Sequence, residues 1–269
     1  MANTDVMWVE KYRPKNLTDL VNQKEVKGSL SGLIKNESEM PHLLFSGSAG
    51  VGKTTTAICI SHQILGDSWK DYTLELNASD ERGINMVRER VKKFSRFAGL
   101  DSQIPFKIII LDEADEMTSD AQTALRRIIE DTAKFCRFIL IANNISKIID
   151  PIQSRCAVFK FTRIDENEII DQLKIISKKE KIKVDDKGLN EITKYAKGDM
   201  RHAINLLQAV ASTGNITQSS VKSTAGLTKT NDVSGVLKLA ISGKLQDARN
   251  KMIESVSYTH LTLPTNREV

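Results

Sequence analysis

The sequence predicts an α/β fold, in which a domain built on a parallel β-sheet is followed by a small all-helical domain. Three observations support this fold class. A short apolar run, 43–45, leads into a glycine-rich loop and then into a helical pattern. The continuous aliphatic run 108–111 is typical of a central parallel strand that is covered on both faces. After residue 162 strands and helices no longer alternate, and only helical spacing remains.

The composition is that of a globular chain long enough for a buried core. Of its 269 residues, 40% are hydrophobic and 27% charged, and the net charge of +5 suits a polyanionic partner without requiring one. Cys59, Cys136 and Cys156 lie far apart, in or beside apolar stretches, which predicts reduced core thiols and argues against a disulfide framework or a zinc site. The first residues lack a basic and apolar leader, and no apolar run approaches membrane-spanning length. We therefore expect a cytosolic or nuclear protein without a membrane partner.

The opening segment, 8–14, combines two aromatic residues, alternating charges and a proline. Two interpretations remain open. The segment is either an arm laid over a nucleotide, with Val9 and Tyr12 near the base and Arg13 supplying a positive charge, or a segment that only fills a surface groove. The spacing of the apolar residues that follow predicts a helix over 24–34.

A Gly-x-x-x-x-Gly-Lys-Thr loop follows the first predicted strand and opens a helix. Its glycines let successive backbone N–H groups point at one anion, and the helix N-terminus adds further attraction for phosphate. Lys53 can then reach the β and γ phosphates, and the Thr54 hydroxyl can ligate Mg²⁺. The residues predicted to hold ATP are Gly47, Ser48, Ala49, Gly50, Val51, Gly52, Lys53, Thr54 and Thr55.

A second predicted strand, 72–76, ends at Asn77 and is followed by a helical pattern. Arg88, Lys92 and Arg96 recur on one face of that helix, every four residues. Such a row can track a nucleic-acid backbone, but a solvated helix face gives the same pattern.

The aliphatic strand 108–111 delivers Asp112 and Glu113, which is the Walker B arrangement. Asp112 is expected to hold Mg²⁺, directly or through water, and Glu113 to orient and polarise the attacking water. Ser119 and Gln122 have the spacing of a capping box at the start of the next helix. On that helix Arg126 and Arg127 lie off the apolar stripe and are open to solvent, DNA or a neighbouring subunit.

A further buried strand, 138–142, delivers Asn143 to the sheet edge where ligands bind in open α/β folds. Asn143 could contact the γ-phosphate or the attacking water, although asparagine is also an ordinary turn residue. Twelve residues on, Arg155 lies in a Ser-Arg-Cys segment before a short strand, 158–161. It is either a local surface charge or a residue that reaches across an interface.

The predicted domains are 1–163 for the sheet domain, 164–227 for the helical domain and 228–256 for the beginning of a third, helical unit. In the second, Gly198 ends a helix and Asp199 caps the next, whose first turn carries Arg201. In the third unit, 228–256, Leu245 is one of the residues expected in the core. This unit is expected to be incomplete, and 257–269, which loses helical periodicity, to be a non-native tail.

The order of these motifs closely resembles that of replication factor C small subunits, which are AAA+ clamp-loader ATPases. The resemblance covers about residues 7–253 and depends on no single motif. The motifs that support the resemblance are Trp8-Val9-Glu10-Lys11-Tyr12-Arg13-Pro14, the phosphate loop, Leu76-Asn77-Ala78-Ser79-Asp80-Glu81-Arg82-Gly83, Asp112-Glu113-Ala114-Asp115, Ser154-Arg155-Cys156 and Gly198-Asp199-Met200-Arg201.

The resemblance implies an AAA+ ATP-binding domain, a helical lid and a partial C-terminal collar. It gives Asn143 the sensor 1 position, Arg201 the sensor 2 position and Arg155 the arginine finger, which enters the ATP site of the adjacent subunit. It makes Asn77 a candidate restraint on Glu113 until DNA is bound. The residues expected to touch DNA phosphates are Arg82, Arg88 and Lys92.

The implied cofactors are ATP and Mg²⁺, and the implied partners are the large subunit and other small subunits of a pentameric ring, a sliding clamp and primer-template DNA. ATP binding opens the clamp and hydrolysis releases the loader, with weak ATPase expected for the isolated subunit. The expected location is the nucleoid-associated cytoplasm for an archaeal source and the nucleus for a eukaryotic one.

An Asp-Glu-Ala-Asp helicase is disfavoured because a second motor domain does not fit in the remaining length, and a bacterial clamp-loader subunit because its zinc-binding cysteines are missing. The sequence is also compatible with another AAA+ DNA-remodelling ATPase and with a nucleotide-binding scaffold without turnover. The presence of Lys53, Asp112, Glu113 and Arg155 argues against the scaffold.

Overall fold

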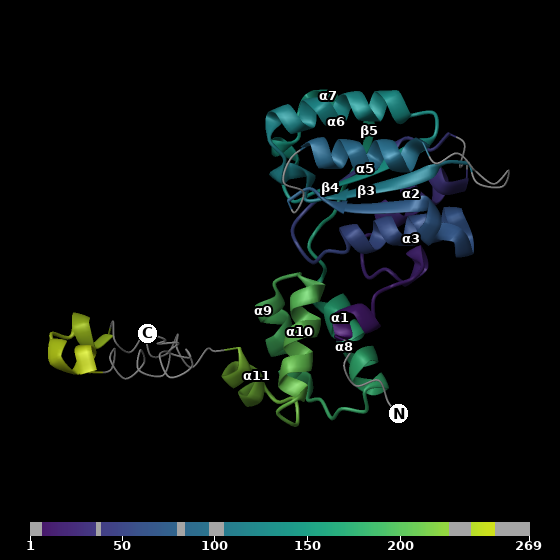
Figure 1. Ribbon diagram of the computed structural model, residues 1–269. Helices are drawn as coiled ribbons and strands as arrows, with labels where there is room; N and C mark the ends of the chain where they lie inside the picture. The colour runs from purple at the N-terminus through teal and green to yellow at the C-terminus, as the bar shows by residue number, and fades with distance from the viewer. Residues whose placement is uncertain (1–6, 36–38, 80–83, 97–104, 226–237, 251–269) are drawn as a thin grey trace, which may run out of the picture.

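The computed structural model describes residues 7–35, 39–79, 84–96, 105–225 and 238–250. A sheet domain and a helical domain follow each other along the chain, and the N-terminal helix α1 lies beside the helical domain (Figure 1). Among the described residues, no helix has both the length and the apolar content needed to cross a membrane.

The sheet has five strands in the order β2-β3-β4-β1-β5, and every neighbouring pair is parallel. This order puts the phosphate loop, which follows β1, beside the residues that follow β4, because Ser46 pairs with Ala142. The polar residues predicted after separate strands therefore share one edge of the sheet. The strands are β1 (His42–Ser46), β2 (Thr73–Asn77), β3 (Lys107–Asp112), β4 (Cys136–Ala142) and β5 (Cys156–Lys160).

Helices cover both faces of the sheet (Figure 1). Successive strand residues point to opposite faces, so Leu43 and Phe45 join one core and Leu44 joins the other. Burial on both faces explains why these strands are aliphatic throughout. The helices on one face are α2 (Lys24–Lys35) and α3 (Lys53–Leu65), and those on the other are α5 (Ile84–Arg96), α6 (Ser119–Thr132) and α7 (Asp150–Gln153).

The capping box predicted at Ser119 and Gln122 is wrong. Thr118 is the N-cap of α6, and its side chain accepts a hydrogen bond from Ala121 N. The Gln122 side chain is buried and bonds elsewhere, so it does not reach back to the cap. The remaining short helices of the sheet domain are η1 (Leu17–Asp19), η3 (Gly66–Ser68), α4 (Trp69–Tyr72), η4 (Ala114–Glu116) and η5 (Ile145–Lys147).

The helical domain packs around its own apolar core, which includes Leu173, Ile192 and Leu207. Its helices are α8 (Glu166–Lys179), α9 (Asp186–Ala196), α10 (Met200–Ala211) and α11 (Gln218–Thr224). Asp199 is the N-cap of α10, as predicted, and its carboxylate accepts from His202 N at 2.9 Å.

The N-terminal arm, α1 (Trp8–Lys11) and Tyr12, packs against this helical core. Trp8 N also donates to the side-chain oxygen of Gln208 in α10, at 2.9 Å. The arm is therefore attached to the helical domain as well as to the chain that leads into the sheet domain.

Residues 238–241 and 245–250 form two further helical segments. Ala248 is buried, but Leu245, predicted as a core residue, is 70% exposed. That prediction is wrong because the described part of the chain does not cover the Leu245 side chain.

Candidate functional site

A cavity of about 190 Å³ lies where the phosphate loop, the N-terminal arm and the helical domain meet. Most predicted site residues are brought together here. The predicted residues that line it are Val9, Tyr12, Arg13, Ala49, Gly50, Val51, Gly52, Lys53, Thr54, Thr55, Asp112, Glu113, Asn143 and Arg201.

The phosphate loop contacts the helical domain directly. Gly50 and Gly52 have φ angles of +68° and +97°, which favour glycine. A Cβ on Gly50 would also lie 1.7 Å from Oδ1 of Asp199, and Met200 N donates to the Gly50 carbonyl at 3.1 Å. Gly50 is therefore required both by the turn and by the close approach of α10.

Lys53 is 7% exposed, and its ammonium is surrounded by oxygen acceptors. Nζ donates to the carbonyls of Gly47 and Ser48, at 2.7 and 2.8 Å, and to Oδ1 of Asn143 at 2.9 Å. Burial lowers the pKa of Lys53, while Asp112 and Asp115 act in the opposite direction. Gly47 and Ser48 thus face the lysine with their carbonyls and are not among the residues that line the cavity.

Thr54 and Asp112, the predicted metal ligands, are in contact. The Thr54 hydroxyl donates to Oδ2 of Asp112 at 2.6 Å. Both supply hard oxygen ligands, which suit Mg²⁺. Among the described residues no group of three or more His, Cys, Asp or Glu could hold a metal. This does not conflict with Mg²⁺, which commonly binds through one or two protein oxygens, water and substrate phosphates.

Glu113 lines the same cavity from a strained backbone position. Its φ of 54° is in the left-handed region, and its N–H donates to Oδ1 of Asp112 at 2.8 Å. The Asn77 side-chain oxygen accepts from the N–H and hydroxyl of Ser79 at 3.0 and 2.9 Å. A restraint of Glu113 by Asn77 stays a prediction.

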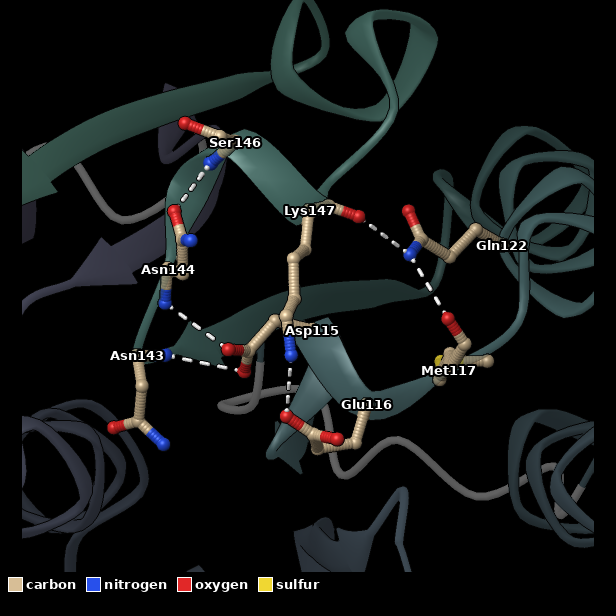
Figure 2. A network of polar contacts seen from close by, with 8 residues as sticks. All are labelled: Asp115, Glu116, Met117, Gln122, Asn143, Asn144, Ser146 and Lys147. Atoms are coloured by element: carbon tan, nitrogen blue, oxygen red, sulfur yellow. Dashed lines mark hydrogen bonds and ion pairs between the residues drawn. The ribbon is translucent and has the colours of Figure 1, made fainter.

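Asp115 joins the loop after β3 to the loop after β4 (Figure 2). Its carboxylate is 5% exposed and accepts from Asn143 N at 3.1 Å and Asn144 N at 3.0 Å. A second link comes from Gln122, whose amide nitrogen donates to the carbonyls of Met117 and Lys147 (Figure 2). Sequence reasoning assigned Asp115 no role, because no local pattern reveals a carboxylate that bonds to backbone across two strands.

The arm and the helical domain close the opposite side of the cavity. Arg201, in the first turn of α10, is exposed and lines the cavity beside Met200. Arg13 Nε donates to the Thr55 hydroxyl at 3.4 Å, which ties the arm to α3.

The arm is also anchored at the end of α8. The Tyr12 hydroxyl and the Lys11 ammonium both donate to Oε1 of Glu180, at 2.5 and 2.6 Å. The hydrogen bond from Lys11, followed by that from Tyr12, lowers the pKa of Glu180. Burial, together with the bond to Glu180, raises the pKa of Tyr12. No sequence pattern pointed to Glu180.

Arg155 is not among the residues lining this cavity. It lies after α7, where Nη2 pairs with Oε1 of Glu130 on α6 at 2.5 Å and Nη1 donates to the Pro151 carbonyl at 2.6 Å. Its side chain is 37% exposed. Arg155 is thus a surface residue of its own chain.

The predicted DNA contacts fall largely outside the described structure. Arg82 and the side chain of Arg88 are outside it, while Lys92 is partly exposed on α5. DNA binding by these residues stays a prediction.

Two family models match the chain. Residues 43–163 match the ATPase family associated with various cellular activities (AAA). Residues 171–212 match the RCF1/5-like AAA+ ATPase lid domain.

Whole-chain comparisons agree with these matches. The chain is 49% identical to the replication factor C small subunit of Staphylothermus marinus over 250 residues, covering 93% of this chain and 75% of that relative. It is 48% identical to the replication factor C small subunit of Aeropyrum pernix, covering 91% and 75%. The fold is similar to that of the Thermotoga maritima RuvB Holliday junction branch migration motor, with a TM-score of 0.63, 19% identity and coverage of 80% and 72%.

Proposed function

Since the chain belongs to the replication factor C small subunit family of AAA+ ATPases, we propose that it hydrolyses ATP as one subunit of a loader that places a sliding clamp on primer-template DNA. One observation carries the assignment of the ATP site. It is that Lys53 donates a hydrogen bond to Asn143, and Thr54 one to Asp112, beside a single cavity that the arm and the helical domain also line.

The phosphates of ATP are assigned to residues 47–54 and the N-terminus of α3, where backbone N–H groups and the helix dipole attract an anion. With ATP bound, the Lys53 ammonium would pair with a phosphate. It would then replace the neutral carbonyls of Gly47 and Ser48, which Lys53 contacts now, by a charged partner. Val9, Tyr12 and Arg13 are assigned to the base end, because they reach the cavity from the arm.

Hydrolysis is assigned to Asp112, Glu113 and Asn143, at the carboxyl ends of β3 and β4, together with Thr54 of α3 and Arg201 of α10. Mg²⁺, held by Thr54 and Asp112, would neutralise charge on the phosphate oxygens. Glu113 would orient and polarise the attacking water, and Asn143 would hold the γ-phosphate or that water. Arg201 would draw the helical domain toward the γ-phosphate, since it enters the cavity from α10.

Arg155 is proposed to act in trans as the arginine finger of a neighbouring subunit's site. Its separation from its own cavity and its exposure support this role. An arginine supplied in this way stabilises charge in the transition state only after assembly, so weak ATPase is proposed for the isolated subunit.

The proposed ring contains the large subunit and other small subunits, held together through the collar that begins in 228–256. The proposed ATPase domain is 1–163 and the lid is 164–227. Arg82, Arg88 and Lys92 are proposed to contact DNA phosphates, which gives affinity that depends on salt and little on sequence.

The experiment that tests the ATP site compares Lys53→Ala and Glu113→Gln with the wild type. We expect Lys53→Ala to abolish binding of a fluorescent ATP analogue, because it removes the buried cation. Glu113→Gln should keep binding and lose phosphate release, because an amide polarises water poorly. Lys147→Ala, at an exposed lysine paired with Glu116, serves as the control. Equal ATP affinity in wild type and Lys53→Ala would refute the assignment.

A further inference from the structure

We propose that Asp115 is a positioning residue for ATP hydrolysis, which acts by holding the backbone of Asn143 and so setting where the Asn143 amide meets Lys53. The inference rests on the proposed ATPase function and adds to it a residue that binds neither phosphate nor metal.

The Asp115 carboxylate bridges two consecutive backbone N–H groups (Figure 2). Its two oxygens have separate partners, since Oδ1 accepts from Asn143 N and Oδ2 from Asn144 N. A carboxylate that is 5% exposed has lost most of its hydration, and these charge-assisted bonds replace it. Removing the acceptor would leave two adjacent N–H groups without this partner, so the Asn143 backbone would lose its constraint.

These two bonds constrain the backbone of Asn143. Because the N–H groups on both sides of its Cα are held, the backbone of Asn143 cannot rotate freely. Its side chain is exposed, yet Oδ1 lies 2.9 Å from Lys53 Nζ. Few packing contacts fix the side chain of an exposed asparagine. The backbone hydrogen bonds therefore set the position of the Asn143 Cα, and with it the position from which the side-chain amide extends. The neighbouring Asn144 uses its own side-chain oxygen in the turn, where it accepts from Ser146 N (Figure 2).

Asp115 also belongs to the segment that carries Asp112 and Glu113. Strands β3 and β4 are hydrogen-bonded neighbours, with Leu111 paired to Leu140. The bonds from Asp115 extend this pairing beyond the ends of the strands. Asp112, Glu113 and Asn143 are thereby held in one frame, and misplacement of a catalytic group by about 1 Å can cost about a hundredfold in rate.

The chain offers a matched control one residue away. Glu116 in η4 pairs with Lys147 in η5 at 2.9 Å, so it links the same two loops (Figure 2). Both side chains are 51% exposed, and surface pairs of this kind add little to stability because water screens them. Glu116→Gln therefore breaks a link between the loops without disturbing the Asn143 backbone.

The experiment measures single-turnover ATP hydrolysis, affinity for a fluorescent ATP analogue and the unfolding midpoint in the full chain. Asp115→Asn is expected to lower the hydrolysis rate about tenfold and to change affinity less than about threefold, because the effect falls on Asn143 rather than on the phosphate loop. The double variant with Asn143→Ala should be within about twofold of Asn143→Ala alone. Glu116→Gln should match the wild type within about twofold.

Asp115→Glu tests whether the position of the carboxylate matters apart from its negative charge. It also provides a second variant if Asp115→Asn folds poorly. It keeps the negative charge near Lys53 but shifts the carboxylate by one methylene, so hydrolysis should still fall. Full activity in Asp115→Glu would overturn the proposal, as would multiplicative losses in the double variant or an equal loss in Glu116→Gln. If the wild type itself does not hydrolyse ATP, the proposed function fails instead.

Discussion

The backbone carbonyl of Gly50, in the phosphate loop, accepts a hydrogen bond from Met200 N in the first turn of α10, at 3.1 Å. This bond joins the loop that is proposed to bind phosphate to the helix that carries Arg201. A change in the backbone of the phosphate loop is therefore expected to shift the helical domain directly, through this bond.

Gly50→Ala is expected to reduce ATP affinity about tenfold or more. The new Cβ meets Asp199 at 1.7 Å, and the positive φ adds about 1–2 kcal/mol of strain. Affinity for a fluorescent ATP analogue is the measurement.

Two other glycines separate strain from steric contact. Gly52 has φ +97°, but a Cβ added there would meet no atom within 4 Å, so any loss of affinity in Gly52→Ala is expected to come from backbone strain. Gly28, in α2, has neither constraint, and Gly28→Ala should keep the wild-type affinity and stabilise the helix by about 0.5–1 kcal/mol. A loss in Gly52→Ala equal to that in Gly50→Ala would contradict the role given to the contact with Asp199.

Arg155→Ala is expected to lower ATPase in the assembled loader by about a hundredfold or more, and to leave the isolated chain within about twofold of the wild type. The reason is that Arg155 lies away from its own cavity and pairs with Glu130. Steady-state phosphate release, with and without the partner subunits, clamp and primed DNA, is the measurement. Lys134→Ala, at another exposed cation of the sheet domain, is the control. An equal loss in isolation would place the function of Arg155 within its own subunit.

The double variant Arg88→Ala, Lys92→Ala is expected to bind primer-template DNA with a weaker dependence on salt. Each lost phosphate contact lowers the slope of log affinity against log salt by about 0.9, so the slope should fall by about 1.8. Titrations from low to high salt with labelled DNA give this slope. Lys174→Ala changes an exposed lysine on α8, which pairs with Asp186, and should leave the slope unchanged. If the double variant keeps the wild-type slope, the row on α5 is a solvated face.

His42 is expected to make folding sensitive to mild acid. Burial, assisted by Arg137, lowers its pKa from 6.5 to about 4, and its Nδ1 accepts a hydrogen bond from Phe138 N at 3.1 Å. Because the pKa is lower in the folded state, the neutral histidine contributes its full stability above pH 6.5, and this contribution is lost as the pH falls toward 4. The shift corresponds to about 3 kcal/mol at most.

Chemical unfolding of the wild type and His42→Asn across this pH range tests the prediction. Asparagine retains an acceptor for Phe138 N but does not titrate, and the carboxylates common to both proteins cancel in the difference. The stability gap between the two proteins should therefore change from pH 6.5 to pH 4. A constant gap would show that His42 does not titrate in the course of unfolding.

The sequence by itself determined the parallel α/β fold, the change to helices after residue 162 and most of the polar residues that line the cavity. These follow from local patterns. A glycine-rich loop before a helix and polar residues after aliphatic strands imply one shared sheet edge once the strands are parallel. Lys53, Asp112 and Asn143 could therefore be named before their distances were known. Such patterns are less accurate at the ends of elements, which is why the cap of α6 was assigned to Ser119 rather than Thr118.

Only the tertiary structure revealed the contacts of Asp115, the approach of Asp199 to Gly50 and the anchoring of Tyr12 by Glu180. Each contact joins segments that are far apart in the chain. Asp115 and Asn143 are 28 residues apart, and Tyr12 and Glu180 are 168 residues apart. The period of a pattern shows which face of an element a residue occupies, but it carries no distance to another element. Those distances are set by the strand order and by the packing of α10 and the arm over the sheet edge, because these bring the distant groups within bonding range.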